Sequence, residues 1–323
     1  MFCDSCGGSN RAEARFCRVC GSPLWLPDTE PATLESTSPL PAPSSARAAP
    51  TIAQGARAGD RYVILGELNR GGMGVVYAAH DPVLDRDVAV KVLRRELSED
   101  AALVQRFLRE ARIAAALRHP NVVSIHDIGR SDLGHFFVMD FIDGRNLAEI
   151  VEDRGYLPLN DAKRIVHECA RAVAFAHNAG VLHRDLKPEN VMLDNNGHVV
   201  VLDFGLARAL RDERHTRHGG ILGSPRYMSP EQLVGQDADV RCDVFSVGLL
   251  FYYLLVGRPL FDGQSLAEIR RQHDAWVVEE RLSALEIPLP VIDIMRSMLA
   301  RRLEDRLPDL LLAARFEEFR QPW

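Results

Sequence analysis

Three glycines within four residues, Gly71, Gly72 and Gly74, lie between two segments with the composition of β-strands, at 62–68 and 75–79. Glycine lets the backbone approach a phosphate closely and present its N–H groups to it, although ordinary tight turns use the same residue. A dinucleotide-binding loop would be followed by a helix, and a Walker A loop would end in Lys and a hydroxyl residue. Neither feature follows here, so the pattern favours a β-hairpin whose turn covers a phosphate.

A third strand is predicted at 88–93, where alternating residues could direct Lys91 beneath this turn. The next segment predicts an amphipathic helix that begins at Ser98, and Glu110 lies on it, where it could pair with Lys91. Taken singly, a strand Lys and a helix Glu are ordinary surface residues. From residue 161 onward helical patterns dominate, and Gly180 is placed to end the first of these helices. Strands followed by helices predict an α+β fold in which a small β-rich lobe joins a larger helical lobe.

A set of motifs follows in a fixed order. Residues 183–190 read His-Arg-Asp-Leu-Lys-Pro-Glu-Asn, residues 203–205 read Asp-Phe-Gly, and residues 228–231 read Met-Ser-Pro-Glu. Asp243 begins an apolar helical segment, and Arg306 lies beyond it. With these motifs, residues 61–320 resemble the eukaryotic-like Ser/Thr protein kinases of bacteria. The resemblance implies a bilobal protein-kinase fold, and it implies that Arg306 pairs with Glu231.

The resemblance also implies a role for each residue of the catalytic set. Asp185 would accept or orient the proton of a substrate hydroxyl, and Lys187 would neutralise the γ-phosphate of ATP. Asn190 and Asp203 would hold Mg²⁺, with Mn²⁺ as the alternative ion. Lys91 and Glu110 would complete the catalytic residues, and Lys187 together with Ser224 would indicate Ser/Thr acceptors. The residues expected to bind the nucleotide are Leu68, Asn69, Gly71, Gly72, Gly74, Val76, Ala89, Lys91, Asp140, Ile142 and Met192.

One position departs from the family's glycine loop, and another suggests regulation by phosphorylation. Asn69 replaces the first glycine of the family's loop, and we expect it to be tolerated because Asn accepts left-handed backbone better than most residues. Thr216, flanked by Arg and His residues, is expected to be phosphorylated and to pair with Arg184. The alternative is that the kinase is active without phosphate on Thr216.

Four cysteines, Cys3, Cys6, Cys17 and Cys20, form two Cys-x-x-Cys pairs separated by ten residues. This spacing predicts a closed, structural zinc ribbon over residues 1–24; two disulfides are the alternative, which the lack of an export signal disfavours. Residues 25–60 are rich in Pro, Ala and Ser and predict a disordered linker.

The net charge of −6 gives no reason to expect a nucleic-acid partner, and no apolar run is long enough for a membrane span. We therefore expect protein substrates, a protein contact through the ribbon, and a cytoplasmic location. An active protein kinase is the favoured hypothesis. A nucleotide-binding scaffold without phosphate transfer is the second, and a chain whose main functional element is the ribbon is the third.

Overall fold

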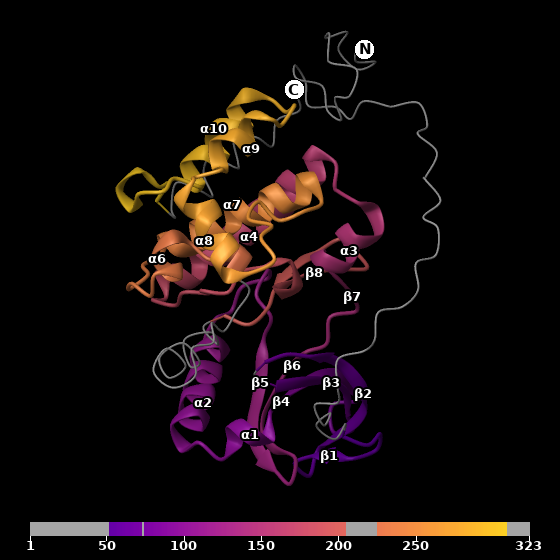
Figure 1. Ribbon diagram of the computed structural model, residues 1–323. Coiled ribbons are helices and arrows are strands. Elements are labelled where there is room, and N and C mark those ends of the chain that lie inside the picture. Colours follow the sequence, from indigo (N-terminus) through magenta and orange to yellow (C-terminus); the bar gives the residue numbers. More distant parts are fainter. Residues whose placement is uncertain (1–51, 73, 205–224, 309–323) are drawn as a thin grey trace, which may run out of the picture.

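The computed structural model describes residues 52–72, 74–204 and 225–308, except for the side chains of Arg106 and Glu110. Within these residues the chain forms two lobes, one built on a β-sheet and one built from helices (Figure 1). The predicted α+β, bilobal architecture is confirmed.

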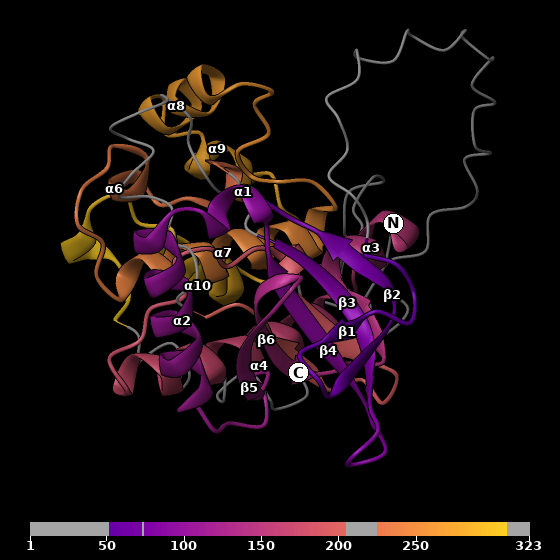
Figure 2. The ribbon, with the colours of Figure 1, turned by 90° about the horizontal axis from the view of Figure 1, so that it is seen from below.

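The N-terminal lobe contains an antiparallel sheet whose described strands lie in the order β1-β2-β3-β4-β6-β5. The strands are β1 (Arg57–Ala58), β2 (Tyr62–Arg70), β3 (Gly74–Asp81), β4 (Arg86–Leu93), β5 (Ile125–Ser131) and β6 (Gly134–Asp140). Because side chains alternate along a strand, β4 serves two cores. Val90 faces a cluster that contains Tyr62 and Tyr77, whereas Ala89 faces a cluster formed with helix α2 (Ala101–Ala115). Figure 2 shows α2 alongside the sheet.

The start of α2 corrects one prediction. Ser98 ends a short preceding helix, α1 (Arg95–Ser98), where its hydroxyl donates to the carbonyl of Arg94. Asp100 is the residue that caps α2, because its carboxylate accepts from the N–H groups of Ala102 at 2.8 Å and Leu103 at 3.2 Å.

The predicted linker also ends earlier than expected, because residues 52–60 are folded. β1 pairs with the start of β2, Ala58 is fully buried, and Ile52 packs against the same cluster. The N–H of Ile52 donates to the hydroxyl of Tyr77 at 3.5 Å. These nine residues therefore belong to the sheet lobe.

The C-terminal lobe is helical apart from a small antiparallel sheet in the order β7-β8-β9. Its described elements are β7 (Gly144–Asn146), α3 (Leu147–Arg154), α4 (Leu159–Asn178), η1 (Pro188–Asn190), β8 (Val191–Asp194), β9 (Val199–Val201), η2 (Pro225–Tyr227), α6 (Pro230–Leu233), α7 (Arg241–Val256), α8 (Leu266–Asp274), α9 (Val278–Ser283), α10 (Leu289–Met298) and η3 (Leu303–Asp305). Gly180 follows α4 with φ +74°, as predicted for a helix end.

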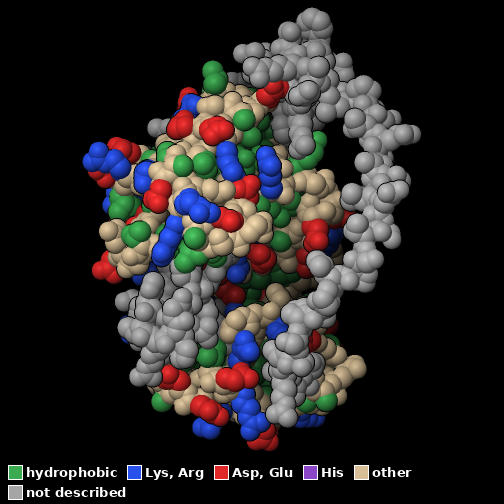
Figure 3. Space-filling model, viewed as in Figure 1, with side chains coloured by type: hydrophobic (Ala, Val, Ile, Leu, Met, Phe, Trp, Pro, Cys, Tyr) green, Lys and Arg blue, Asp and Glu red, His purple; other side chains and the backbone are tan. Residues whose placement is uncertain are grey.

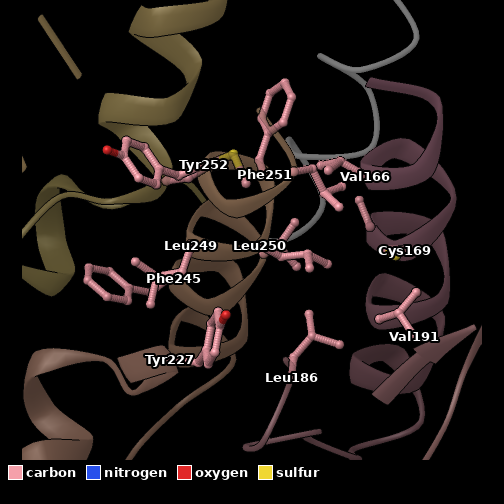
Figure 4. Close-up of a cluster of buried hydrophobic side chains, with 14 of the residues drawn as sticks. Val166, Cys169, Leu186, Val191, Tyr227, Phe245, Leu249, Leu250, Phe251 and Tyr252 are labelled. Carbon is pink, nitrogen blue, oxygen red and sulfur yellow. The ribbon is translucent and has the colours of Figure 1, made fainter. Parts of the chain in front are cut away.

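Helix α7 is the centre of this lobe. It is apolar around most of its circumference, as expected of a helix that is surrounded by protein. Figure 4 shows Leu249, Leu250 and Phe251 of α7 packed among side chains that include Val166 of α4 and Leu186 of the 183–190 segment. This packing fixes the 183–190 segment to the core of the helical lobe through Leu186. No helix in the described part of the chain is long and apolar enough to cross a bilayer.

Candidate active site

The residues of the predicted catalytic loop lie together between α4 and β8. Lys187 Nζ lies 3.3 Å from Asp185 Oδ2. The side-chain amide of Asn190 donates to the backbone carbonyl of Asp185 at 2.8 Å and approaches Asp185 Oδ2 at 3.4 Å. An eight-residue run thus presents a carboxylate, an ammonium group and an amide in one place.

Asp243, at the start of α7, holds the backbone of this loop. Its carboxylate accepts from the N–H groups of His183 at 2.8 Å and Arg184 at 2.7 Å, and from His177 Nε2 at 2.8 Å. The carboxylate is fully buried, and burial alone would raise its pKa; the bonds from His177 and the Arg184 N–H lower the pKa of Asp243 overall. Arg184 has φ +65°, a conformation that non-glycine residues seldom adopt. The Asp243 bonds therefore stabilise a strained residue directly before Asp185.

Across the lobes, Lys91 Nζ forms an ion pair with Asp203 Oδ2 at 2.6 Å. Lys91 comes from β4 of the sheet lobe, and Asp203 follows β9 of the helical lobe with φ +58°. Phe204 is buried and lies against His183, with ring centroids 4.8 Å apart. The pairing of Lys91 with Glu110 remains a prediction, because the Glu110 side chain lies outside the described residues.

The residues expected to line the adenine come from both lobes and from the segment that joins them. Val76 and Ala89 lie on the sheet lobe beside the α2 cluster, which also includes Ile142 of the segment joining the lobes. Met192 lies on β8 of the helical lobe, and Asp140 ends β6. The space-filling view in Figure 3 shows a recess between the two lobes. Leu68 on β2 is half exposed.

The glycine loop corrects one expectation, the reason given for Asn69. Asn69 lies in β2, opposite Val76 of β3, and does not have a positive φ. The tolerance of Asn for left-handed backbone is therefore not the reason why Asn can replace glycine at position 69. A Cβ atom on Gly74 would lie 2.4 Å from the carbonyl oxygen of Val92, so Gly74 is required for strand packing. The N–H of Gly71 donates to the Gly74 carbonyl at 2.9 Å, and Gly71 and Gly72 are exposed.

The donor set around Asp203 fits a magnesium ion. Asp203 supplies a carboxylate, and Asn190 uses its NH₂ toward Asp185, which leaves its amide oxygen for a cation. Oxygen donors of this kind suit Mg²⁺. The described residues contain no group of three or more His, Cys, Asp and Glu side chains arranged to hold a metal.

Beyond the cleft, the predicted pair of Arg306 and Glu231 is confirmed. Two guanidinium–carboxylate bonds of 2.8 and 3.2 Å join these buried side chains. Thr216, Ser224 and the four N-terminal cysteines, Cys3, Cys6, Cys17 and Cys20, lie outside the described residues, so the predictions for them stand untested.

Three supporting residues were not predicted. Besides Asp243 and His177, Gln232 supports the loop, because its NH₂ donates to the Arg184 carbonyl at 3.2 Å. The one sequence signal for Asp243 was an acidic residue at the head of an apolar helix. His177 and Gln232 carry no local signal, since their partners lie 66 and 48 residues away.

Comparison with known proteins agrees with this geometry. The protein kinase domain family matches residues 62–315. The chain is 41% identical over 219 residues to serine/threonine-protein kinase PrkC of Bacillus subtilis, covering 68% of this chain and 34% of that protein. It is 38% identical over 255 residues to serine/threonine-protein kinase PknB of Mycobacterium leprae, covering 76% and 41%. The chain thus spans well under half the length of these relatives.

The crystal structure of the Mycobacterium tuberculosis PknI kinase domain superposes with a TM-score of 0.64 at 28% identity. The match covers 83% of this chain and 99% of that one. The similarity therefore extends over both lobes.

Proposed function

The chain belongs to the protein kinase family, and we propose that it is an ATP-dependent kinase that phosphorylates Ser and Thr hydroxyls of proteins, itself included, in bacterial cytoplasmic signalling. The observation that carries this proposal is that the sheet lobe and the helical lobe each contribute charged residues to the expected site. Asp185, Lys187 and Asn190 lie on the helical lobe, and the pair of Lys91 and Asp203 joins it to the sheet lobe. A scaffold that only bound nucleotide would not need the complete set.

Each residue has a task in phosphoryl transfer. The transition state is loose, so the enzyme acts chiefly by positioning and by neutralising charge. Asp185 orients the acceptor hydroxyl and takes its proton, while the neighbouring Lys187 neutralises charge on the γ-phosphate. Asn190 and Asp203 would hold Mg²⁺, which when bound would offset the negative charge of the phosphates.

Lys91 connects nucleotide binding to this step. In the pair of Lys91 and Asp203, the ammonium lies at the boundary between the lobes, where it can reach the α- and β-phosphates. The adenine would lie between Ala89 and Met192, with its edge at the backbone of Asp140 and Ile142. The lysine at position 187 supports Ser/Thr rather than Tyr acceptors, as do the names of the relatives.

The test is transfer of labelled γ-phosphate from Mg-ATP to a generic protein acceptor, followed by phosphoamino-acid analysis. We expect label on Ser and Thr with the wild type, and none above background with Lys91→Met or Asp185→Asn. Label on Tyr alone would contradict the acceptor assignment, and equal labelling by Asp185→Asn would contradict the mechanism.

For the N-terminal part we propose a zinc ribbon over residues 1–24, a linker that ends near residue 51, and the kinase domain beyond it. The spacing of the four cysteines supports the ribbon, and the folding of residues 52–60 supports the new linker end. One equivalent of zinc in the purified chain, lost in Cys3→Ser/Cys6→Ser, is expected. A zinc-free wild type would contradict the proposal.

We further propose that phosphate on Thr216 pairs with Arg184 and raises activity. The basic residues around Thr216 support this proposal, as does the position of Arg184 next to Asp185. Thr216→Ala should lower activity, and mass spectrometry should find phosphate at Thr216 in the wild type. Full activity of Thr216→Ala without phosphate in the wild type would refute it.

A further inference from the structure

Asp140, the last residue of β6, is joined by three contacts to Ser124, which precedes β5, and to His126 within β5. Its N–H donates to the carbonyl of Ser124 at 3.0 Å. The N–H of Ser124 donates in return to Asp140 Oδ2 at 3.2 Å, and His126 Nε2 lies 2.6 Å from Asp140 Oδ1. A carboxylate can only accept, so His126 is the donor. Both carboxylate oxygens are therefore engaged on one side of the strand.

These contacts depart from a regular antiparallel ladder in one respect. Ile125 lies opposite Met139, so the next pair outward is Ser124 and Asp140. In a hydrogen-bonded pair, two residues exchange N–H and backbone carbonyl in both directions. Here one direction is regular, but the Ser124 N–H is taken by the Asp140 side chain in place of the Asp140 carbonyl. The carboxylate thus substitutes for the carbonyl of its own residue.

Because the substitution occurs where the adenine edge is expected, it has a consequence for nucleotide binding. We propose, on the basis of the proposed kinase function, that Asp140 and His126 are positioning residues that hold the Asp140 carbonyl available for the nucleotide. The Asp140 carboxylate occupies the Ser124 N–H, and His126 fixes the orientation of that carboxylate. Without the carboxylate, Ser124 would compete with the nucleotide for the carbonyl.

The same arrangement selects the base. A backbone carbonyl accepts from the 6-amino group of adenine, whereas it faces a second acceptor in the 6-oxo group of guanine. Mispairing of this kind in a buried site is strongly unfavourable, because polar groups are left without partners. A carbonyl fixed toward the cleft therefore prefers ADP and ATP to GDP and GTP.

The experiment measures dissociation constants of Mg-ADP and Mg-GDP by calorimetry, and KM and kcat for ATP. For Asp140→Ala we expect KM for ATP to rise about fivefold with kcat within about twofold, as for a lost binding interaction. The preference for ADP over GDP should fall at least about threefold. His126→Ala should show a smaller change in the same direction. Asp140→Asn should stay near the wild type, because its amide oxygen still accepts from Ser124.

A matched control is His80→Ala. His80 Nδ1 lies 3.1 Å from Asp87 Oδ1, so it forms a pair of the same chemistry between β3 and β4 of the same sheet. This variant should keep the wild-type ADP/GDP preference and KM. The preference is a ratio measured on folded sites, so partial unfolding of a variant does not change it.

The outcomes separate this inference from the proposed function. A wild type that binds ADP and transfers phosphate, with an unchanged ADP/GDP preference in Asp140→Ala, would overturn the inference alone. Equal losses in Asp140→Asn and Asp140→Ala would also overturn it, since the Ser124 bond would then not be the cause. A wild type that binds no ADP would overturn the inference and the proposed function together.

Discussion

Replacing Asp243 by Asn tests how the catalytic loop is held. The change preserves shape but leaves one oxygen where there were two, so the new NH₂ group must face the N–H of Arg184 or that of His183. A hydrogen bond to a charged group contributes about 1.5–3 kcal/mol, and an unsatisfied buried donor costs about 1–3 kcal/mol. Breaking a buried charged network costs about 3–5 kcal/mol in all, which is the loss we expect in the free energy of unfolding.

Asp243→Asn should also lower the catalytic rate. Arg184, in its left-handed conformation, is held by the Asp243 carboxylate through its N–H, and Asp185 is the next residue. Once that bond is lost, Arg184 can relax and displace Asp185, so kcat should fall at least about tenfold. The KM for ATP should change less, because the adenine site lies on other elements.

The assay is urea unfolding at pH 7 together with steady-state transfer kinetics. Asp153→Asn is the matched control, because Asp153 forms an exposed ion pair with Arg145 at 3.2 Å and should cost no more than about 1 kcal/mol. If Asp243→Asn unfolds within about 1 kcal/mol of the wild type and keeps its kcat, the anchoring role assigned to Asp243 is wrong.

Three further predictions concern stability. His273 is buried, and burial lowers its pKa from 6.5 to about 3. The contribution of His273 to the free energy of unfolding should therefore be complete above pH 6.5 and fall as the pH drops toward 3, by about 2 kcal/mol at pH 5. In His273→Leu the melting temperature should depend less on pH between pH 7 and 5 than in the wild type. An unchanged pH dependence of the melting temperature would refute this. Arg306→Met leaves a buried carboxylate on Glu231 and should cost about 3–5 kcal/mol, with partial recovery in the double variant that also carries Glu231→Met. Removal of residues 1–51 should leave the melting temperature unchanged. Removal of residues 1–60 should cost about 2–4 kcal/mol through lost burial of Ala58 and Ile52, and equal melting temperatures would contradict the role of β1.

The residues of the expected site stand out in the sequence more clearly than the residues that support them. The chemistry of Asp185, Lys187 and Asn190 is carried by one short run, so their proximity follows from local chain geometry. Alternation along β4 gives Lys91 the same face as Ala89, and Lys91 pairs there with Asp203 of the other lobe.

The misplaced details have physical reasons. Ser98 and Asp100 are both good capping residues, and only the packing of α2 decides between them. The end of the linker could not be read from composition, since Ala58 and Ile52 are too few to form an apolar pattern. The ion pair of Lys91 with Asp203 was not predicted, because it depends on how the two lobes meet, which no local pattern specifies.

The most direct test of the central claim separates binding from transfer at Asp185. Mg-ATP affinity is measured by calorimetry, and phosphate transfer is followed in a single turnover with excess enzyme. We predict that Asp185→Asn binds Mg-ATP within about threefold of the wild type but transfers phosphate at least about a hundredfold more slowly, because Asp185 acts on the acceptor hydroxyl. Equal single-turnover rates for the two proteins would contradict the claim that this cleft is a kinase active site.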